Sequence, residues 1–315
     1  MSARLIMKLD VVEVAREGDD VVVVGFRHPR RPRLPLATPG AHVDLHLPDG
    51  RVRQYSLCGD PDDESVYRVA VKREEEGRGA SRWLHDHLRV GETLNVSAPR
   101  SHFEIADEAT RHVMIAGGIG ITPFVPMVQR LARRGADFVL HYLSRRADPP
   151  FLGTLREACG PLRLALHLHG GSRFDPASAF PGHDPGTHVY CCGPLRLTTA
   201  MRAASEAAGW PDERLHVEAF KALFDEGFAP EPFEVEVAST GAVIAVAAER
   251  SLLDALKENG IDLPSSCLIG VCGSCECGHS GGDVIHRDVV LGPARRRARM
   301  IPCVSRARGR LRLHL

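Results

Sequence analysis

The sequence lacks three features, and each absence excludes a class of protein. It has no excess of charge, because 40 acidic and 40 basic side chains give a formal net charge of +0 over 315 residues. We therefore expect no nucleic-acid partner and no membrane-surface partner. No apolar run approaches the ~18 residues of a membrane span, and residues 1–20 lack the apolar core of a signal peptide. We expect a cytoplasmic protein whose nine cysteines are reduced unless a ligand binds them.

The residue pattern changes twice along the chain, which indicates more than one domain. Residues 8–103 read as strands between turns rich in glycine and proline, with no evident crossover helix, as in an antiparallel barrel or sandwich. From Ala106 onwards, short apolar strands alternate with helical segments, which is typical of a parallel α/β sheet. A proline-containing break at residues 227–230 precedes two further strands and a short helix. The predicted domains are 1–106, 107–228 and 229–315.

Two of the predicted helices begin at caps that can be specified. Thr122 is expected to be the N-cap of a helix whose first position is Pro123. Ser251 is expected to cap the helix of the third domain, with Asp254 in the capping-box position and Gly260 at the helix end. These caps predict where each helix starts.

Four of the nine cysteines have the spacing of an iron–sulfur site. Cys267, Cys272 and Cys275 read C-x4-C-x2-C, and Cys303 lies much further on, a pattern typical of plant-type [2Fe–2S] ligands. Glycines in this loop allow backbone N–H groups to turn towards the sulfur atoms. We interpret Cys277 as a thiol that does not bind the cluster. Two alternatives stay open, namely buried cysteines without a ligand and structural zinc, which usually pairs C-x2-C with another close pair.

Two glycine turns in the second domain indicate a nucleotide site. Residues 117–123 (GGIGITP) lie between a strand and a helix, where backbone N–H groups suit a phosphate, although Pro123 replaces the last glycine of the dinucleotide fingerprint. Residues 192–194 (CGP) follow a later strand in the same way. Packing would explain either turn alone. Two such turns at the carboxyl ends of strands in one α/β domain favour a nucleotide cleft.

Two motifs of the first domain contain residues suited to a phosphorylated ring compound. Arg53 is suited to hold a phosphate, Tyr55 to pack on a ring system and Ser56 to donate a hydrogen bond. The turn at residues 77–81 (GRGAS) leads into a predicted helix and offers a second phosphate seat. Taken alone, the first motif is explained more simply by an ordinary strand with a surface arginine.

The motifs, and their order along the chain, resemble those of the phthalate dioxygenase reductase family. Members of this family are ferredoxin–NADP reductase-like flavoproteins with a plant-type ferredoxin fused at the C-terminus. The resemblance covers essentially the whole chain. Residues 53–61 (RQYSLCGDP), 286–291 (HRDVVL) and 302–307 (PCVSRA) also resemble the vanillate O-demethylase reductase branch. The implied fold comprises an antiparallel β-barrel flavin domain, an α/β parallel-sheet nucleotide domain and an α+β β-grasp ferredoxin domain.

The resemblance implies FMN, NADH and a [2Fe–2S] cluster as cofactors, with FAD and NADPH as the alternatives. The implied cofactor-binding residues are Arg53, Tyr55, Ser56, Leu57, Lys72, Gly77, Gly79, Ala80, Ser81, Gly117, Gly118, Gly120, Thr122, Cys192, Gly193 and Pro194. The implied metal ligands are Cys267, Cys272, Cys275 and Cys303. Ser56 would lie near the reactive flavin nitrogen, Thr122 between flavin and nicotinamide, and Cys192 beside the nicotinamide. These three are the candidate catalytic residues.

The implied function is that of the reductase component of a multicomponent, Rieske-type oxygenase or demethylase. Such a chain would pass electrons from NADH through FMN and the cluster to a separate non-haem iron oxygenase. The alternatives are an FAD-containing electron-transfer subunit of a larger complex and a zinc-stabilised nucleotide-binding regulator. Arg145 and Arg146 weaken the NADH assignment, because an arginine at the end of the second strand accommodates the extra phosphate of NADP.

The last segment of the chain is rich in arginine. Residues 295–297 are three consecutive arginines shortly before Cys303. The simplest interpretation is a solvated basic face. Our hypothesis is that these side chains help to dock an acidic patch of the electron acceptor, since complementary charge chiefly speeds association.

Overall fold

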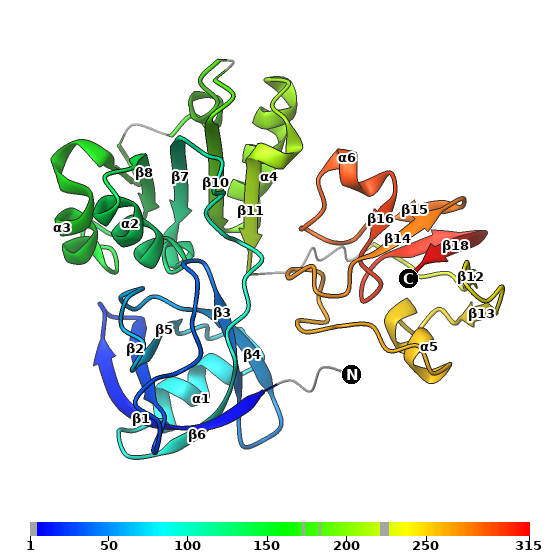
Figure 1. Cartoon of the computed structure of the whole chain (residues 1–315), viewed down its shortest axis with the longest axis horizontal. Helices are drawn as coiled ribbons and strands as arrows, with labels where there is room; N and C mark the ends of the chain where they lie inside the picture. Colours follow the sequence, from blue (N-terminus) through cyan, green and yellow to red (C-terminus); the bar gives the residue numbers. More distant parts are fainter. Residues whose placement is uncertain (1–4, 172–173, 183, 221–226) are drawn as a thin grey trace. The chain divides into compact units, whose positions relative to one another are not determined.

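The structure, a computed structural model, describes residues 5–171, 174–182, 184–220 and 227–315 (Figure 1). It divides into two compact units, Met1–Val217 and Glu218–Leu315. The first unit contains two sheets, and the second has a sheet of its own. The predicted boundaries after residues 106 and 228 remain predictions. None of the helices among the described residues has the length and hydropathy needed to span a bilayer.

The first sheet has the order β4-β3-β6-β1-β2-β5, and the neighbouring strands pair antiparallel. Its elements are β1 (Ile6–Arg16), β2 (Val21–Arg27), β3 (His42–His46), β4 (Val52–Ser56), β5 (Tyr67–Lys72), helix α1 (Ala80–His87) and β6 (Thr93–Ser97). Along β1, Met7, Leu9 and Val11 are buried while the residues between them are more exposed, which is the alternation of a strand with one face on a core. Leu57, just after β4, bridges to Val69 of β5 and so brings the two edge strands together. The sheet therefore closes into a barrel.

The second sheet has the order β11-β10-β7-β8-β9. It consists of β7 (Arg111–Gly117), β8 (Asp137–Ser144), β9 (Leu164–Leu168), β10 (Thr187–Gly193) and β11 (Leu215–Ala219), with helices α2 (Phe124–Arg133), α3 (Leu152–Arg163) and α4 (Leu195–Ala207). The pairs β10–β7, β7–β8 and β8–β9 are parallel. Met114 of β7 packs with Phe124 of α2, whereas the next residue, Ile115, packs with Met201 of α4. The sheet is thus covered on both faces, as parallel sheets require.

The predicted helix start at Thr122 is wrong. Residues Gly118–Ile121 form a short 3₁₀ helix, η1, and α2 begins only at Phe124. Thr122 has helical dihedral angles, and its hydroxyl donates to the carbonyl of Ile119 at 3.1 Å instead of accepting from the first turn of α2. The reason is tertiary, because Gly120 of η1 packs closely against Cys192 at the end of β10.

The second unit contains a mixed sheet in the order β13-β12-β18-β14-β16 and a separate pair, β15–β17. Its elements are β12 (Phe233–Val237), β13 (Val243–Val246), α5 (Leu252–Glu258), β14 (Cys277–Ser280), β15 (Asp283–Ile285), α6 (Pro293–Arg296), β16 (Arg299–Met300), β17 (Arg306–Arg308) and β18 (Arg310–His314). Ser251 caps α5 as predicted, since its hydroxyl accepts the N–H of Asp254 at 3.1 Å. Antiparallel, parallel and mixed sheets in this order confirm the predicted fold class.

Candidate functional site

Three arginines surround the turn that starts α1. The Arg51 guanidinium donates to the carbonyl of Arg78 at 2.8 Å. A Cβ atom on Gly79 would lie 2.7 Å from the same guanidinium, and Gly79 also has a φ of +84°, so this position requires glycine. Arg53 follows on β4, on the same side of the chain as Arg51. Burial, and then the charge of Arg78, lower the pKa of Arg53.

Such a concentration of positive charge at a helix N-terminus is suited to an anion. The predicted residues Arg53, Gly77 and Gly79 lie at or beside the turn that starts α1. Arg51 and Arg78 were not predicted from the sequence as residues of this site. The signal for Arg51 was present, because residues two apart on a strand share a face.

The other residues predicted to bind the flavin differ in their burial and hydrogen bonds. Tyr55 is partly buried against the core of the barrel, and this burial raises the pKa of its phenol to about 12. The Ser81 hydroxyl accepts the N–H of Glu74 at 3.1 Å, and Ala80 is the first residue of α1. Lys72 lies 3.5 Å from the carboxylate of Glu74. Ser81 and Lys72 thus hold the connection between β5 and α1.

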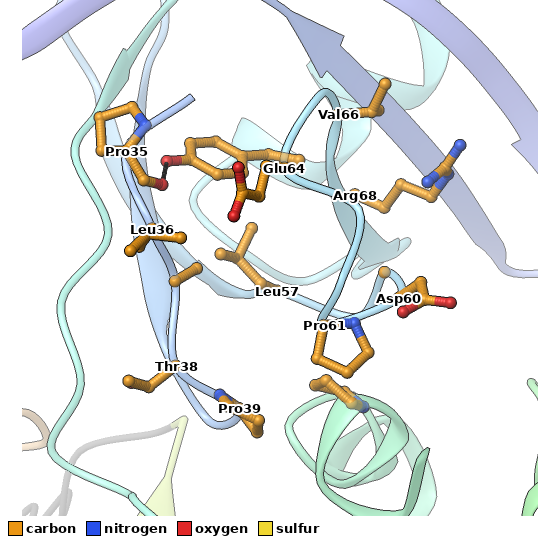
Figure 2. Close-up of a pocket in the computed structure, with 14 residues that line it drawn as sticks. Pro35, Leu36, Thr38, Pro39, Leu57, Asp60, Pro61, Glu64, Val66 and Arg68 are labelled. Carbon is orange, nitrogen blue, oxygen red and sulfur yellow. Dashed lines mark hydrogen bonds between the residues drawn. The ribbon is translucent and has the colours of Figure 1, made fainter. Parts of the chain in front are cut away.

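Leu57 lines a small cavity in the first unit (Figure 2). The cavity lies between loops of the barrel, represented by Leu36, Thr38 and Pro61, and Pro126 of α2. Its volume is about 40 Å³, which is enough for a few water molecules and too small for a flavin or a nucleotide.

The two predicted glycine turns meet at the point where the parallel sheet changes direction. From β7 the chain proceeds to β8 and β9 on one side, and then returns to β10 on the other. A Cβ on Gly117 would lie 2.8 Å from Pro194, and one on Gly193 would lie 3.0 Å from the Cα of Gly117. A Cβ on Gly120 would lie only 2.3 Å from the carbonyl oxygen of Cys192. Ligands of open α/β sheets bind at such a switch point.

Two of the candidate catalytic residues lie at this switch point. Thr122 and Cys192 are both buried, and Thr122 directly follows η1. Gly118, the first residue of η1, has a φ of +56° and open space around it. The third candidate, Ser56, is buried at the end of β4 in the barrel. The contacts described therefore bring together the residues of the two glycine turns.

Ion pairs join the barrel to the elements of the parallel sheet. Arg133 of α2 lies 2.6 Å from Asp60, and Arg130 lies 2.9 Å from Asp62. Arg146, one of the two arginines after β8, lies 3.2 Å from the carboxylate of Asp20. Arg146 therefore already forms an ion pair with a carboxylate of the barrel.

The four predicted metal ligands come together in the second unit. The thiol of Cys267 contacts those of Cys272 and Cys303, and Cys303 also contacts Cys275. Hydrogen bonds from Cys272 and Cys303 lower the pKa of the Cys267 thiol. Among the residues that the structure describes, no three His, Cys, Asp or Glu side chains are arranged to hold a single metal ion. The thiols instead form a chain of contacts in the order Cys272, Cys267, Cys303 and Cys275.

The loop backbone is shaped around the first of these sulfurs. The N–H groups of Ile269 and Val271 donate to the sulfur of Cys267 at 3.5 and 3.4 Å. Gly270, with a φ of +76°, allows the reversal between them, and Leu268 also has a positive φ, 59°. Donors directed at a thiolate stabilise its negative charge. The loop is therefore built to hold a thiolate at Cys267.

Cys277 is separate from this group. It belongs to β14 and packs among buried residues of the sheet, including Met300 and Leu313. Burial raises the pKa of its thiol to about 12, so it stays protonated. Cys275 and Cys303 belong to a different apolar cluster, with Leu291.

Comparisons with known proteins agree with this division of sites. Residues 8–105 match a family model described as an oxidoreductase FAD-binding domain, and residues 235–308 match a 2Fe-2S iron-sulfur cluster binding domain. The heme-dependent oxidative N-demethylase beta subunit of Ectopseudomonas mendocina (strain ymp) is 46% identical over 277 residues, 88% of each chain. The vanillate O-demethylase oxidoreductase of Pseudomonas sp. (strain HR199 / DSM 7063) is 36% identical over 92% of this chain and 93% of its own.

A solved structure extends the likeness to the fold. Its title is phthalate dioxygenase reductase, a modular structure for electron transfer from pyridine nucleotides to [2Fe-2S]. It has a TM-score of 0.70 and 33% identity, over 99% of this chain and 98% of that one. The predicted class, a flavin and iron–sulfur oxidoreductase, is confirmed. The chain belongs to the phthalate dioxygenase reductase family, the reductase components of multicomponent oxygenase and demethylase systems.

Proposed function

We propose that this chain carries electrons from NADH, through FMN and a [2Fe–2S] cluster, to a separate terminal oxygenase in the cytoplasm. The proposed domains are 1–106 for FMN, 107–228 for the nucleotide and 229–315 for the cluster. The observation that carries the proposal is the meeting of Cys303 with the three thiols of a loop whose backbone N–H groups are directed at one of them. When bound, the flavin exchanges electrons two at a time with the nucleotide and singly with the cluster.

In the barrel, the arginines around the α1 turn would hold the phosphate of the flavin. Arg53 would pair with the phosphate directly, and Gly79 and Ala80 would offer backbone N–H groups at the helix start. Arg51 bonds to the Arg78 carbonyl and pairs with the carboxylate of Asp49, and it would hold the turn in place beside the phosphate. Tyr55, Ser56, Leu57 and Lys72 would border the ring system.

At the switch point, the glycines would let the pyrophosphate of the nucleotide approach the backbone. Gly117, Gly118, Gly120, Gly193 and Pro194 would line this approach, because side chains at several of these positions would collide with β10 or α4. Thr122 would be held in place by its bond to Ile119 and would orient the nicotinamide. Cys192, whose carbonyl is packed on Gly120, would border the nicotinamide ring.

In the second unit, the pairing of thiols supports a site for two irons. Each iron of a [2Fe–2S] cluster takes two thiolates from the protein. Cys267 contacts Cys272 and Cys303, and Cys303 contacts Cys275, so all four thiols are joined. Of these contacts, Cys267 with Cys272 and Cys275 with Cys303 would each serve one iron. A zinc site would instead need four ligands around one point.

NADH is favoured over NADPH by the contacts of Arg146. An arginine after the second strand of a dinucleotide fold binds the 2′-phosphate of NADP only when it is available to do so. Arg146 already lies 3.2 Å from carboxylates of both Asp19 and Asp20. This pairing removes one of the two arginines that opposed the NADH assignment.

The proposed acceptor is a Rieske-type non-haem iron oxygenase that hydroxylates or demethylates a small organic compound. A second candidate is a haem-containing demethylase, because the 46% identical relative is a subunit of a heme-dependent oxidative N-demethylase. Mixing the reduced chain with each purified class of oxygenase, and following cluster reoxidation, would separate the two candidates.

The spectrum and cofactor content of the purified chain test the proposal. We expect a brown-yellow protein with broad visible absorption, one acid-released FMN per chain on a chromatographic column, and faster cytochrome c reduction with NADH than with NADPH. One FAD per chain would overturn the FMN assignment and favour the subunit of a larger complex. A colourless protein that contains zinc would establish the regulator instead.

A further inference from the structure

The segment between β15 and α6, residues 286–291, lies directly against the cysteine loop. The N–H of Val289 donates to the carbonyl of Gly270 at 3.1 Å. A Cβ on Gly270 would lie 3.2 Å from the Cα of Asp288, and one on Gly273 would lie 3.2 Å from Val290. This segment therefore supports the part of the loop that directs N–H groups at Cys267.

The carboxylate of Asp288 forms hydrogen bonds within this segment. Oδ2 of Asp288 accepts the N–H groups of Val290 and Leu291 at 3.0 and 2.7 Å. Asp288 is 0% exposed. A fully buried carboxylate carries a large desolvation cost unless other groups compensate it, so the position demands a compensating environment.

Two basic residues provide that environment. The guanidinium of Arg296 donates to the Asp288 carbonyl at 2.9 Å and lies 3.7 Å from its Oδ2. Nδ1 of His286 lies 3.6 Å from the other carboxylate oxygen, Oδ1. Both His286 and His279 of β14 place Nε2 at 3.1 Å from the carbonyl of Arg296. The network thereby links β14, α6 and residues 286–291.

We infer that Asp288 is a positioning residue for the cluster. By fixing Val289 and Val290 beneath Gly270 and Gly273, it keeps the N–H groups of Ile269 and Val271 directed at the sulfur of Cys267. The inference rests on the proposed role of Cys267 as a ligand. Asp288 itself does not touch iron in this scheme, since its carboxylate is occupied by Val290 and Leu291.

Two substitutions in the full chain separate the hydrogen bonds of Asp288 from its charge. Asp288→Ala removes both, whereas Asp288→Asn retains an oxygen that accepts the two N–H groups and loses the charge facing Arg296. Ser251→Ala is the control, because it removes a helix cap in the same unit and leaves the segment 286–291 intact. The readouts are iron release to a ferrous chelator and hydrogen exchange of the loop amides.

For Asp288→Ala we expect iron release about tenfold faster than in the wild type, with faster exchange at Ile269, Val271 and Leu291. Asp288→Asn should release iron about threefold faster, and Ser251→Ala should stay within twofold of the wild type. The inference would be overturned if Asp288→Ala released iron at the wild-type rate. It would also be overturned if Ser251→Ala accelerated iron release as much as Asp288→Ala does. If the alanine variant does not fold, the asparagine variant decides the test, and iron release from it at the wild-type rate would overturn the inference.

The experiment also distinguishes this inference from the proposed ligand role. A wild-type protein that holds no iron would contradict the assignment of Cys267. In that case, the exchange of the Ile269 and Val271 amides still tests whether Asp288 orders the loop. Unchanged exchange in both Asp288 variants would then refute the positioning role by itself.

Discussion

At the scale of single residues, the cysteine loop divides its sulfur atoms between two environments. Cys272 and Cys275 contact other thiols at the proposed cluster, whereas Cys277, two residues further on, points into the core of the sheet. Cys277 is the first residue of β14, and the pairing of this strand holds its side chain in the core of the sheet, away from the other thiols.

Replacing Cys277 by alanine should therefore leave the cluster in place. Loss of one buried sulfur should lower the free energy of unfolding by about 1 kcal/mol through the space left behind. Visible absorption and iron content per chain should equal those of the wild type. The companion variant, Cys272→Ala, should lose most of the visible absorption. Loss of iron from Cys277→Ala would contradict the division of thiols.

Residue types at fixed spacing were the most predictable feature of the site. The C-x4-C-x2-C spacing, together with the distant Cys303, identified the four thiols that come together. The alternation along β4 predicted that Arg53 and Tyr55 share one face. Asp288 and Arg78 were not predicted as site residues, because their importance depends on contacts with distant parts of the chain. A buried carboxylate and an exposed one look the same in a sequence.

At the scale of elements, the nucleotide site depends on how closely two turns approach. The turn after β7 and the turn after β10 pack glycine against glycine, with Gly120 against the carbonyl of Cys192. This approach also explains why the helix cap at Thr122 was mispredicted. The local pattern, threonine before proline, indicated an N-cap, but packing of η1 on β10 sets the backbone there instead.

A methyl group at Gly120 should disrupt this approach. A Cβ only 2.3 Å from the Cys192 oxygen forces the backbone apart, so Gly120→Ala should cost about 3 kcal/mol of folding free energy. It should also weaken NADH binding. Denaturant unfolding and NADH titration are the measurements.

Gly153→Ala is the matched control for that substitution. Gly153 lies in the first turn of α3, and nothing would contact an added Cβ. Because alanine favours a helix by up to about 1 kcal/mol relative to glycine, this variant should be as stable as the wild type or more stable. Equal losses in both variants would exclude the packing explanation.

At the scale of the whole molecule, the chain must deliver its electrons to another protein. The predicted basic face near Cys303 is only partly available for this purpose. Arg295 and Arg299 both pair with Glu276, the residue after Cys275, and Arg296 belongs to the Asp288 network. Arg295 and Arg296 therefore have different partners although they are neighbours in the sequence.

The docking hypothesis is best tested without Arg296. Arg295→Glu combined with Arg297→Glu should slow reduction of the protein acceptor about tenfold at low ionic strength, and the difference should fade in salt, since surface charge mainly governs association. Reduction of a small dye should be unchanged. Arg308→Glu is the control, because Arg308 is similarly exposed, 66% against 57% for Arg295, and lies on β17. An unchanged rate of acceptor reduction by the double variant would contradict the docking hypothesis.

The order of strands in the second unit has a consequence for biosynthesis. β18 follows all the other strands in sequence, yet it occupies the middle of the sheet, between β12 and β14. The barrel and the parallel sheet are complete by Ala219 and can fold while translation continues. The last sheet has to wait until residues 310–314 have left the ribosome. Iron and sulfide must therefore be inserted after synthesis of these residues, whereas the flavin has a folded barrel to enter before then.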